Sequence, residues 1–191
     1  MASYVLRWAR CVPNAIRKTP YETSIMQRTK AIELLTQHKI AFEVKEFTAT
    51  EFTVEETSEH LGIPLNQLFK TLVVKGERRG IVMALVNGDA QLSLSKLAKA
   101  MGDKRAEMIE VDDLFRVTGY LKGGCSPLGA RKAFPVFMDQ SALTHERISV
   151  SAGLRGVQML LAPADLQRVT RATVADLRDN SVDLLQKFIG A

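Results

Sequence analysis

The sequence predicts a mixed α+β domain built around one β-sheet. Segments rich in β-forming residues outnumber helical ones, and most follow one another through short turns. Helical segments of ordinary length are interspersed among them, and neither internal repeats nor low-complexity tracts interrupt the pattern. The 191-residue chain is long enough to bury the core of one such domain. The residues alone leave open whether the sheet closes into a barrel.

The first regular signals come after residue 27. Ala31, Leu34, Leu35 and His38 recur at the spacing i, i+3, i+4 and i+7, which predicts an amphipathic helix. The following segment 42–47, FEVKEF, alternates apolar and polar residues as a half-buried strand does.

A second helix is predicted from its two ends. Thr53 followed by Glu56 forms a capping box that opens the segment 54–61, VEETSEHL. Gly62 and Pro64 then end the helix, because glycine accepts a left-handed backbone and proline cannot continue a helix.

Two β-rich runs follow, 69–74 and 81–86, and the tripeptide Asn87–Asp89 predicts a hairpin turn into the segment 90–94, AQLSL. The next helix contains four residues at helical spacing and ends at Gly102. These four are Leu94, Leu97, Ala98 and Met101.

The second half of the chain continues with alternating short elements. The pattern predicts a strand at 106–110, a helix from Asp112 to Gly119, strands at 134–138, 147–151 and 157–161, a helix opened by Pro163, and a C-terminal amphipathic piece.

Composition excludes some classes of protein. The chain has no run of about eighteen apolar residues, so we expect no membrane span and no membrane partner. Cys11 and Cys125 are too few and too isolated for a disulfide framework or a metal cluster, which suits a reducing cytoplasm. We therefore expect a cytoplasmic protein without a metal site.

The net charge of +5 is concentrated at the N-terminus. Residues 1–30 carry six basic side chains against one acidic side chain, whereas the rest of the chain has twenty of each sign. Bulk charge therefore does not reveal what the rest of the chain binds. We expect residues 1–26 to be a basic extension that is either disordered or an artefact of the assigned start, with an RNA-contacting arm as the alternative.

Lys70 is the first candidate functional residue. In the predicted strand it shares a face with Leu68, Leu72 and Val74. A lysine on a buried apolar face is costly unless its charge meets an anion or a carbonyl group. The alternative is that Lys70 lies at the mouth of the strand and extends its amine into water.

The loop 118–139, TGYLKGGCSPLGARKAFPVFMD, supplies the second candidate. Gly123 and Gly124 allow close approach of the backbone, so amide groups could bind a ligand oxygen, and Pro127 would stiffen the loop. The loop lacks the Gly-Lys-Ser/Thr triplet of a phosphate-binding loop. A tight turn without a ligand is the alternative.

Cys125 and Ser126 are the nucleophiles that this loop offers. Activation of a thiol requires a base or a positive environment, and none of the three histidines shows a motif that pairs it with Cys125. Ser126 lacks the Gly-x-Ser-x-Gly elbow of a hydrolase nucleophile. We therefore interpret Cys125 as a small filler beside two glycines.

A second loop of small residues, SVSAGLRG at 149–156, connects two predicted strands. Ser151 and Gly153 could offer a hydroxyl and an amide to a polar ligand. An ordinary hairpin connection explains the same residues.

Three of these segments, FKTLVV, GYLKGGCSPLG and SVSAGLRG, resemble in order and spacing the YbaK/EbsC family of the prolyl-tRNA editing superfamily. The opening RTKAIELLTQHKIAFEVKEF and the closing LLAPADLQRVTRATVADL are similar too. The resemblance spans residues 27–178 and leaves 179–191 as a tail. It implies a mixed, largely antiparallel sheet closed into a barrel-like core with surrounding helices.

The resemblance also implies an activity and a set of site residues. The activity is deacylation of mischarged tRNA in trans, most typically Cys-tRNA(Pro), without a metal or organic cofactor; prolyl-tRNA synthetase is an expected partner. Lys70 would be the essential catalytic residue, near the ester and the terminal adenosine. The substrate pocket would be formed by Phe69, Thr71, the Gly123–Pro127 loop with Gly124, Cys125 and Ser126, and the pair Ser151 and Gly153.

Two positions depart from the family pattern. Phe47 stands where type members carry a tyrosine, and Gln158 stands where they carry an aspartate, so a hydroxyl and a possible base are absent. Without an enzymic nucleophile, the resemblance implies that the thiol of a cysteinyl substrate attacks its own ester. The alternatives are a deacylase for alanyl or other small amino-acyl esters that uses water, a hydrolase of small esters, and a non-catalytic module that binds tRNA or a synthetase.

Overall fold

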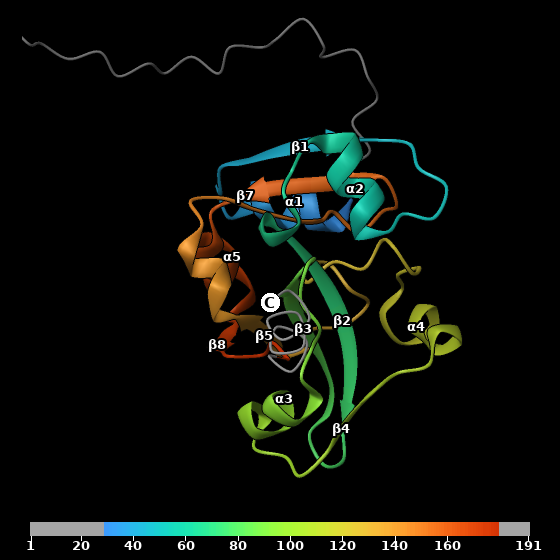
Figure 1. Ribbon diagram of the computed structural model, residues 1–191, viewed down its shortest axis with the longest axis vertical. Helices are drawn as coiled ribbons and strands as arrows, with labels where there is room; N and C mark the ends of the chain where they lie inside the picture. Colours follow the sequence, from blue (N-terminus) through green and yellow to red (C-terminus); the bar gives the residue numbers. More distant parts are fainter. Residues whose placement is uncertain (1–28, 180–191) are drawn as a thin grey trace, which may run out of the picture.

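The computed structural model describes residues 29–179, in which eight strands form one mixed sheet (Figure 1). The strands run in the order β1-β7-β6-β2-β3-β5-β8, and β4 pairs with β2 outside this path. Their bounds are β1 Phe42–Glu46, β2 Leu68–Gly76, β3 Gly80–Asn87, β4 Ala106–Met108, β5 Val136–Asp139, β6 Ile148–Ser151, β7 Val157–Leu161 and β8 Thr173–Ala175.

Five α-helices and two 3-10 turns surround the sheet in the described part of the chain. The helices are α1 Lys30–Gln37, α2 Val54–Leu61, α3 Leu94–Met101, α4 Val111–Thr118 and α5 Pro163–Thr170; the turns are η1 Leu65–Gln67 and η2 Gln140–Thr144. None of these helices is long and apolar enough to span a membrane. The N-terminal extension 1–26 lies outside the described residues, as does nearly all of the tail 179–191.

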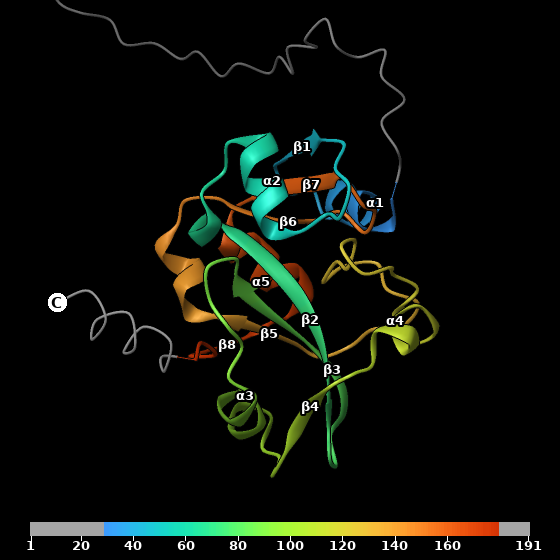
Figure 2. The ribbon, with the colours of Figure 1, turned by 45° about the vertical axis from the view of Figure 1, so that its right-hand side comes forward.

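The mixed α+β class is confirmed, but the prediction of a closed barrel is wrong. The strands β1 and β8 lie at opposite ends of the sheet and do not pair with each other. Closure requires a continuous ring of paired strands. The sheet instead turns sharply where β2 meets β6, because these strands pair over only two residues, Leu68 and Phe69. As a result β1 and β7 cross the molecule at a steep angle to β2 and β3 (Figures 1 and 2).

The strand pairing is mixed, with most of it antiparallel, as predicted. Four pairs of strands in the described sheet are antiparallel, and three are parallel: β2 with β6, β3 with β5, and β5 with β8. Parallel pairs need long crossover connections, which the segments between these strands provide.

Local capping signals identified most helix ends correctly. The Thr53 hydroxyl accepts a hydrogen bond from the Glu56 N–H at 3.2 Å, and Gly62 ends α2 with φ of 63°. The Glu56 carboxylate accepts from the N–H groups of Glu51 and Phe52 at 3.0 and 2.7 Å. This capping box therefore fixes the loop before α2 as well as the helix itself.

The hairpin predicted at Asn87–Asp89 is wrong. The turn leads into α3, and in the segment after it only Leu92 makes a bridge, an isolated one with Arg178. The reason lies in the sheet: β3 is already flanked by β2 and β5, so neither edge is free for another strand.

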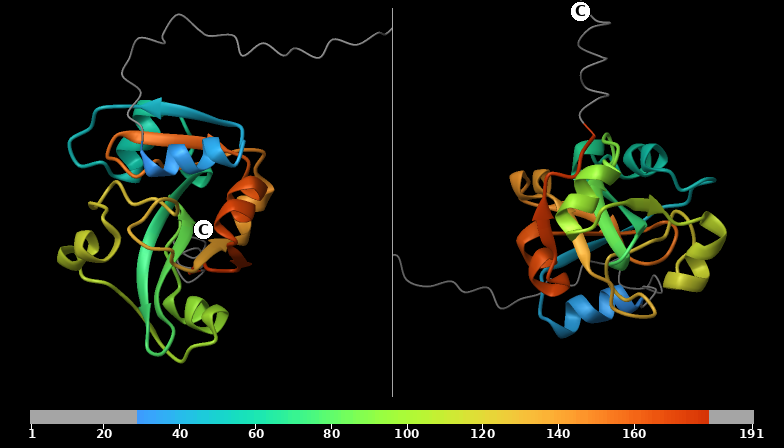
Figure 3. Two further views of the ribbon diagram at one scale, coloured as in Figure 1. Left: turned by 180° about the vertical axis from the view of Figure 1, so that it is seen from behind. Right: turned by 90° about the horizontal axis from the view of Figure 1, so that it is seen from below.

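Two apolar clusters cover the two faces of β2 and β3. Phe69, Val73 and Leu85 pack with residues of α1 and α5 on one face. On the opposite face Val74 and Val82 pack with residues of α3. Figure 3 shows α1 against β7 on the back of the molecule. The side chains of β2 therefore alternate between two cores, and this alternation decides where Lys70 and Thr71 point.

Candidate active site

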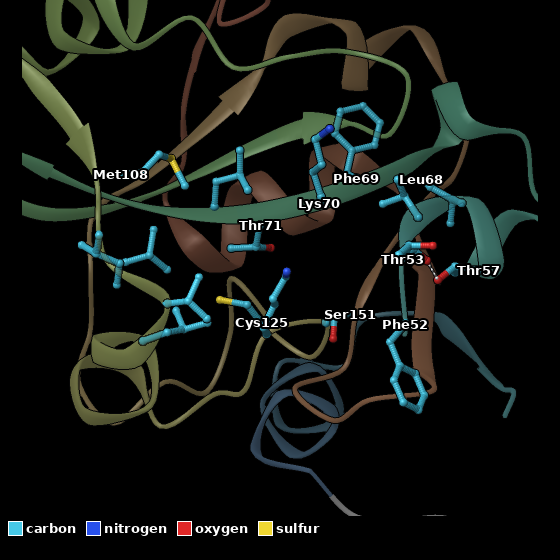
Figure 4. A pocket seen from close by; sticks show the side chains of 18 of the residues that line it. Phe52, Thr53, Thr57, Leu68, Phe69, Lys70, Thr71, Met108, Cys125 and Ser151 are labelled. Atoms are coloured by element: carbon cyan, nitrogen blue, oxygen red, sulfur yellow. Dashed lines mark hydrogen bonds between the residues drawn. The ribbon is translucent and has the colours of Figure 1, made fainter. Parts of the chain in front are cut away.

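A cavity of about 390 Å³ opens beside β2 and brings together segments that are far apart in the sequence. Its walls come from β2, the start of α2, the glycine loop, the β4–α4 connection and the ends of β6 and β7 (Figure 4). Seven residues predicted from the sequence line it: Phe69, Lys70, Thr71, Gly123, Cys125, Ser151 and Gln158. Five predicted residues do not: Phe47, Gly124, Ser126, Pro127 and Gly153.

The cavity exists because one edge of β2 is left open in its middle. Strand β6 pairs with this edge only as far as Phe69, and β4 joins it only from Val74. The carbonyl of Val73 faces this edge, where it accepts a hydrogen bond from the Ile109 N–H at 3.2 Å. By strand alternation the backbone N–H and C=O of Thr71 face the same gap.

The side chain of Thr71 adds a third polar group to this gap. Its hydroxyl is buried and has no hydrogen-bond partner. In Figure 4 it points toward Cys125 and Ser151 across the cavity. A buried hydroxyl without a partner is costly, so this position is suited to a ligand that supplies one.

Lys70 points to the other face of β2, at the end of the cavity nearest to α2. Its amine donates a hydrogen bond to the Gly88 carbonyl at 3.3 Å. Burial lowers the pKa of Lys70, and the neighbouring carboxylates of Glu55 and Asp89 partly oppose this change. The charge is thus held in a partly desolvated place, where it interacts more strongly with an anionic group than it would in water.

The two glycines of the loop, Gly123 and Gly124, approach different parts of the protein. Gly123 lines the cavity with φ of 84°, and a Cβ there would lie 2.9 Å from the Cβ of Phe52. At Gly124 a Cβ would lie 3.0 Å from the backbone nitrogen of Arg155 and 3.2 Å from the carbonyl carbon of Leu154. Gly124 therefore joins the glycine loop to the loop after β6, and a side chain has no room at either position.

We expect Gly124→Val to destabilise the protein by about 1–3 kcal/mol and to impair the cavity, because overpacking would separate these two loops. Gly124→Ala should show a smaller loss, since it adds only the first carbon. Thermal unfolding followed by circular dichroism measures the series. A melting temperature of Gly124→Val equal to that of the wild type would contradict the tight packing of Gly124 against Leu154 and Arg155.

Neither Cys125 nor Ser126 has the surroundings that activate a nucleophile. Burial raises the pKa of Cys125 to about 12, so its thiol is protonated near neutral pH. No histidine lines the described cavity. Ser126 is fully buried away from the cavity, and its hydroxyl accepts a hydrogen bond from the Leu128 N–H at 3.2 Å. The loop thus contributes backbone and shape rather than an activated side chain.

We expect Cys125→Ala to keep at least about half of the wild-type rate of ester cleavage, because a thiol with so high a pKa supplies almost no thiolate. Steady-state rates of the purified variant measure this. Complete loss of activity in a variant that unfolds at the wild-type temperature would instead identify Cys125 as a nucleophile.

The ends of β6 and β7 close the cavity opposite β2. Ser151 and Gln158 are register partners in this pair of strands. The Ser151 hydroxyl accepts a hydrogen bond from the Gly153 N–H at 3.3 Å, and the Gln158 side-chain carbonyl accepts one from the Ser149 hydroxyl at 3.2 Å. Gln158 is thus held in place by a buried serine.

Phe47 lies outside the cavity lining, and the nearby Phe52 takes part in it. The ring of Phe47 packs against those of Phe52 and His60, with centroid distances of 6.1 and 5.8 Å. Sequence reasoning missed Phe52 as a lining residue, together with Glu55 and Lys122. The capping box that holds the Phe52 backbone was the available signal, because it fixes the loop directly before α2.

Four charged residues line the cavity: Glu55, Lys70, Glu110 and Lys122. The described residues contain no group of three or more histidine, cysteine, aspartate or glutamate side chains arranged to hold a metal ion. The cavity therefore combines a mainly apolar wall with two cations, two carboxylates and several hydroxyls. Such a lining suits a ligand that presents a small polar group attached to a larger molecule.

Comparisons with known proteins agree with such a site. Residues 48–169 match the model of the aminoacyl-tRNA editing domain. A protein from Enterococcus faecalis, provisionally named Cys-tRNA(Pro)/Cys-tRNA(Cys) deacylase EbsC, is 41% identical over 79% of this chain and 93% of its own length. The proline–tRNA ligase of Thermosipho africanus is 40% identical over 46% of this chain, a match that covers only 16% of the ligase.

A solved structure shares the fold. A protein described as a provisional trans-editing enzyme for prolyl-tRNA synthetase superposes with a TM-score of 0.70. The match covers 78% of this chain and 95% of that chain at 26% identity. The mixed α+β fold is thus shared with this relative.

Proposed function

This chain belongs to the aminoacyl-tRNA editing domain family, and we propose that it is a trans-acting deacylase that clears mischarged tRNA, with Cys-tRNA(Pro) as its main substrate. The name of the Enterococcus faecalis relative, which aligns over 93% of its length, supports this activity. We assign the editing domain to residues 27–178 and the activity to the cytoplasm, where tRNAs are charged. Prolyl-tRNA synthetase is the proposed partner.

One observation carries the proposal: a partly desolvated cation and an open strand edge meet at the same cavity. Lys70 supplies the charge, and Thr71 supplies two backbone groups and a hydroxyl without a partner. The aminoacyl group would occupy the gap beside Thr71, between β2 and the glycine loop. The charge of Lys70 would then lie near the ester and the terminal phosphate, where negative charge is present or develops.

In the proposed mechanism the nucleophile is the thiol of the substrate and not a group of the protein. The thiolate of the cysteinyl group attacks its own carbonyl carbon, so a C–S bond forms and the C–O bond to the ribose breaks. The ribose oxygen leaves with a proton, and the amino acid leaves as a cyclic thioester that water then opens. The protein lowers the barrier by orienting the thiol and by stabilising the oxyanion of the tetrahedral intermediate.

Water is the alternative attacking group, and Gln158 is the observation behind it, because this departure from the family pattern suggests a substrate other than a cysteinyl ester. A glutamine cannot act as a general base, and its carbonyl already accepts a hydrogen bond from Ser149. A cavity with this residue could accept alanyl or other small amino-acyl esters, whose hydrolysis would use a water held by the Thr71 backbone. In that case activity would not depend on a substrate thiol.

The proposal is tested with a set of mischarged tRNAs. The purified protein is incubated with cysteinyl-tRNA(Pro), alanyl-tRNA(Pro) and correctly charged prolyl-tRNA(Pro), and release of the amino acid is followed. We expect rapid loss of the cysteinyl ester and little loss of the prolyl ester. Binding of these tRNAs without release of any amino acid would show a non-catalytic module, and cleavage of simple amino-acid methyl esters at equal rates would show a general esterase.

A further inference from the structure

A second hollow, of about 550 Å³, is lined in part by the Asn87–Asp89 turn. This turn links the hollow to Lys70, which lines the first cavity. Asn87 is the register partner of Phe69, and the Gly88 carbonyl holds the amine of Lys70. The ring of Phe69 meets that of His145, which lines the second hollow, edge-on at 6.4 Å. The lining consists of Asn66, Asn87, Asp89, Gln140, Ser141, Thr144, His145 and Arg178.

Two residues that line this hollow each carry a buried polar atom that the protein leaves without a partner. Three buried side-chain polar atoms of the described residues lack a hydrogen bond, and two of them, Asn87 Oδ1 and Ser141 Oγ, belong to residues of this wall. Asn87 is only 3% exposed, and its amide nitrogen donates to the Asp89 carboxylate. That bond fixes the orientation of the amide, so Oδ1 is left as an acceptor without a donor.

Asp139 fixes the position of two residues that line the hollow, Ser141 and Arg178. This fully buried carboxylate accepts hydrogen bonds from the N–H groups of Ser141 at 2.9 Å and Leu177 at 2.8 Å. The Arg178 Nε lies 3.6 Å from the same carboxylate. Asp139 thus anchors Ser141 and Arg178 through the same carboxylate oxygen, Oδ1, and this arrangement preorganises the polar groups of the hollow.

The chemistry of the lining selects a ligand that donates a hydrogen bond to Asn87 Oδ1 and accepts one from Ser141. The Asp89 carboxylate beside Asn87 also favours a donor at that end of the hollow, and Arg178 supplies a cation elsewhere in the same lining. The exocyclic amine and ring nitrogens of adenine form such a donor and acceptor pair. The ring of His145 offers a surface for stacking of a base, as in many sites that bind unpaired RNA ends.

We propose that this hollow binds the adenine base of the 3′-terminal adenosine while the aminoacyl ester lies in the first cavity. The inference rests on the proposed function, since only a charged tRNA presents both groups together. The amine of adenine donates to Asn87 Oδ1, and the Ser141 hydroxyl donates to a ring nitrogen. Lys70 then lies between the two subsites, beside the ribose and its phosphate.

Free adenosine is the direct probe. Titration of the full-length wild-type protein with adenosine, followed by NMR of the histidine ring protons, should shift the His145 signals in a saturable way. Inosine carries a carbonyl in place of the amine, so it should bind at least about fivefold more weakly. Shifts that are equal for both nucleosides, or no shift of His145 at all, would overturn the proposal and leave the hollow to water.

Ser141→Ala provides the matched variant. Its hydroxyl is buried without a partner inside the protein, so its removal should leave the unfolding temperature at or above that of the wild type while weakening adenosine binding by roughly fivefold. With cysteinyl-tRNA(Pro), KM should rise by a similar factor and kcat should change little. Ser95→Ala removes a serine hydroxyl from α3, outside both sites, and serves as the control.

The binding and kinetic readouts separate the two proposals. If no charged tRNA is deacylated but adenosine still shifts His145 and Ser141→Ala still weakens binding, the proposed activity fails and the nucleoside subsite stands. If deacylation is normal and Ser141→Ala changes neither KM nor adenosine affinity, the subsite fails and the proposed activity stands.

Discussion

Lys70→Ala should reduce deacylation of cysteinyl-tRNA(Pro) by at least about 100-fold, because loss of one group that stabilises an oxyanion usually costs that much. The amine donates to the Gly88 carbonyl, and its charge is partly desolvated. Among the cavity residues the other cation, Lys122, is exposed on the glycine loop. A lysine in water cannot replace one held beside the ester. Single-turnover rates with excess enzyme measure the chemical step directly.

The stability of the variant separates a functional loss from a structural one. Burial lowers the pKa of Lys70, so its charged form is less favourable in the folded protein than in the unfolded chain. Below this lowered pKa the charge reduces stability in full, and the loss of stability disappears as pH rises from the lowered pKa of the folded protein to the pKa of an unfolded lysine. Lys70→Met keeps the apolar stem and removes the charge. It should therefore unfold at or above the wild-type temperature and be as inactive as Lys70→Ala.

An active, folded Lys70→Met protein would show that the charge is not used. Lys75→Met is the matched control on the same strand, because its amine lies in water and pairs with Glu107 at 3.8 Å. That change should leave both the single-turnover rate and the unfolding temperature close to the wild-type values.

Sequence patterns predicted the secondary structure well where the deciding interactions are local. The helices α2 and α3 begin and end where a capping serine or threonine and a terminal glycine place them. The strand β8 was missed, since its three residues pair only with β5, far away in the chain. The hairpin at Asn87–Asp89 failed for a related reason. A turn signal cannot report that both edges of the preceding strand are already occupied.

The features of the candidate site that depend on local sequence could likewise be predicted, and those that depend on tertiary structure could not. The placement of Lys70 and Thr71 on opposite faces of β2 follows from strand alternation, so both positions could be predicted locally. The gap that exposes the Thr71 backbone could not, because it depends on where β6 ends and β4 begins along the edge of β2. The second hollow was equally hidden, since Asn87 and Ser141 line it together only because of tertiary packing.

The second large effect that we expect is a difference in cleavage rate between cysteinyl and seryl esters. On the same tRNA(Pro), we expect the cysteinyl ester to be cleaved much more than 100-fold faster than the seryl ester. The two substrates differ by one atom, and contacts in a pocket rarely separate such close analogues by more than about 100-fold. Single-turnover rates of the two esters at one pH measure the ratio.

A ratio above that limit requires a chemical role for the thiol. A cysteine thiol has a pKa of about 8.5, so a useful fraction is thiolate near neutral pH, whereas the serine hydroxyl is hardly ionised at all. The cavity offers no competing nucleophile of its own, since burial raises the pKa of Cys125 to about 12. Spontaneous hydrolysis of each ester is subtracted, because esters also react with hydroxide.

Comparable rates for cysteinyl, seryl and alanyl esters would show that water attacks instead. The Thr71 backbone would then hold the water, and Gln158 would be the residue to change first, because its carbonyl accepts the Ser149 hydrogen bond at the end of the cavity. Gln158→Asp would place a carboxylate there as a base, and it should raise the alanyl rate if water is the nucleophile. If the substrate thiol attacks, the same change should leave the cysteinyl rate within about threefold, since a base adds little to a group that already ionises near neutral pH.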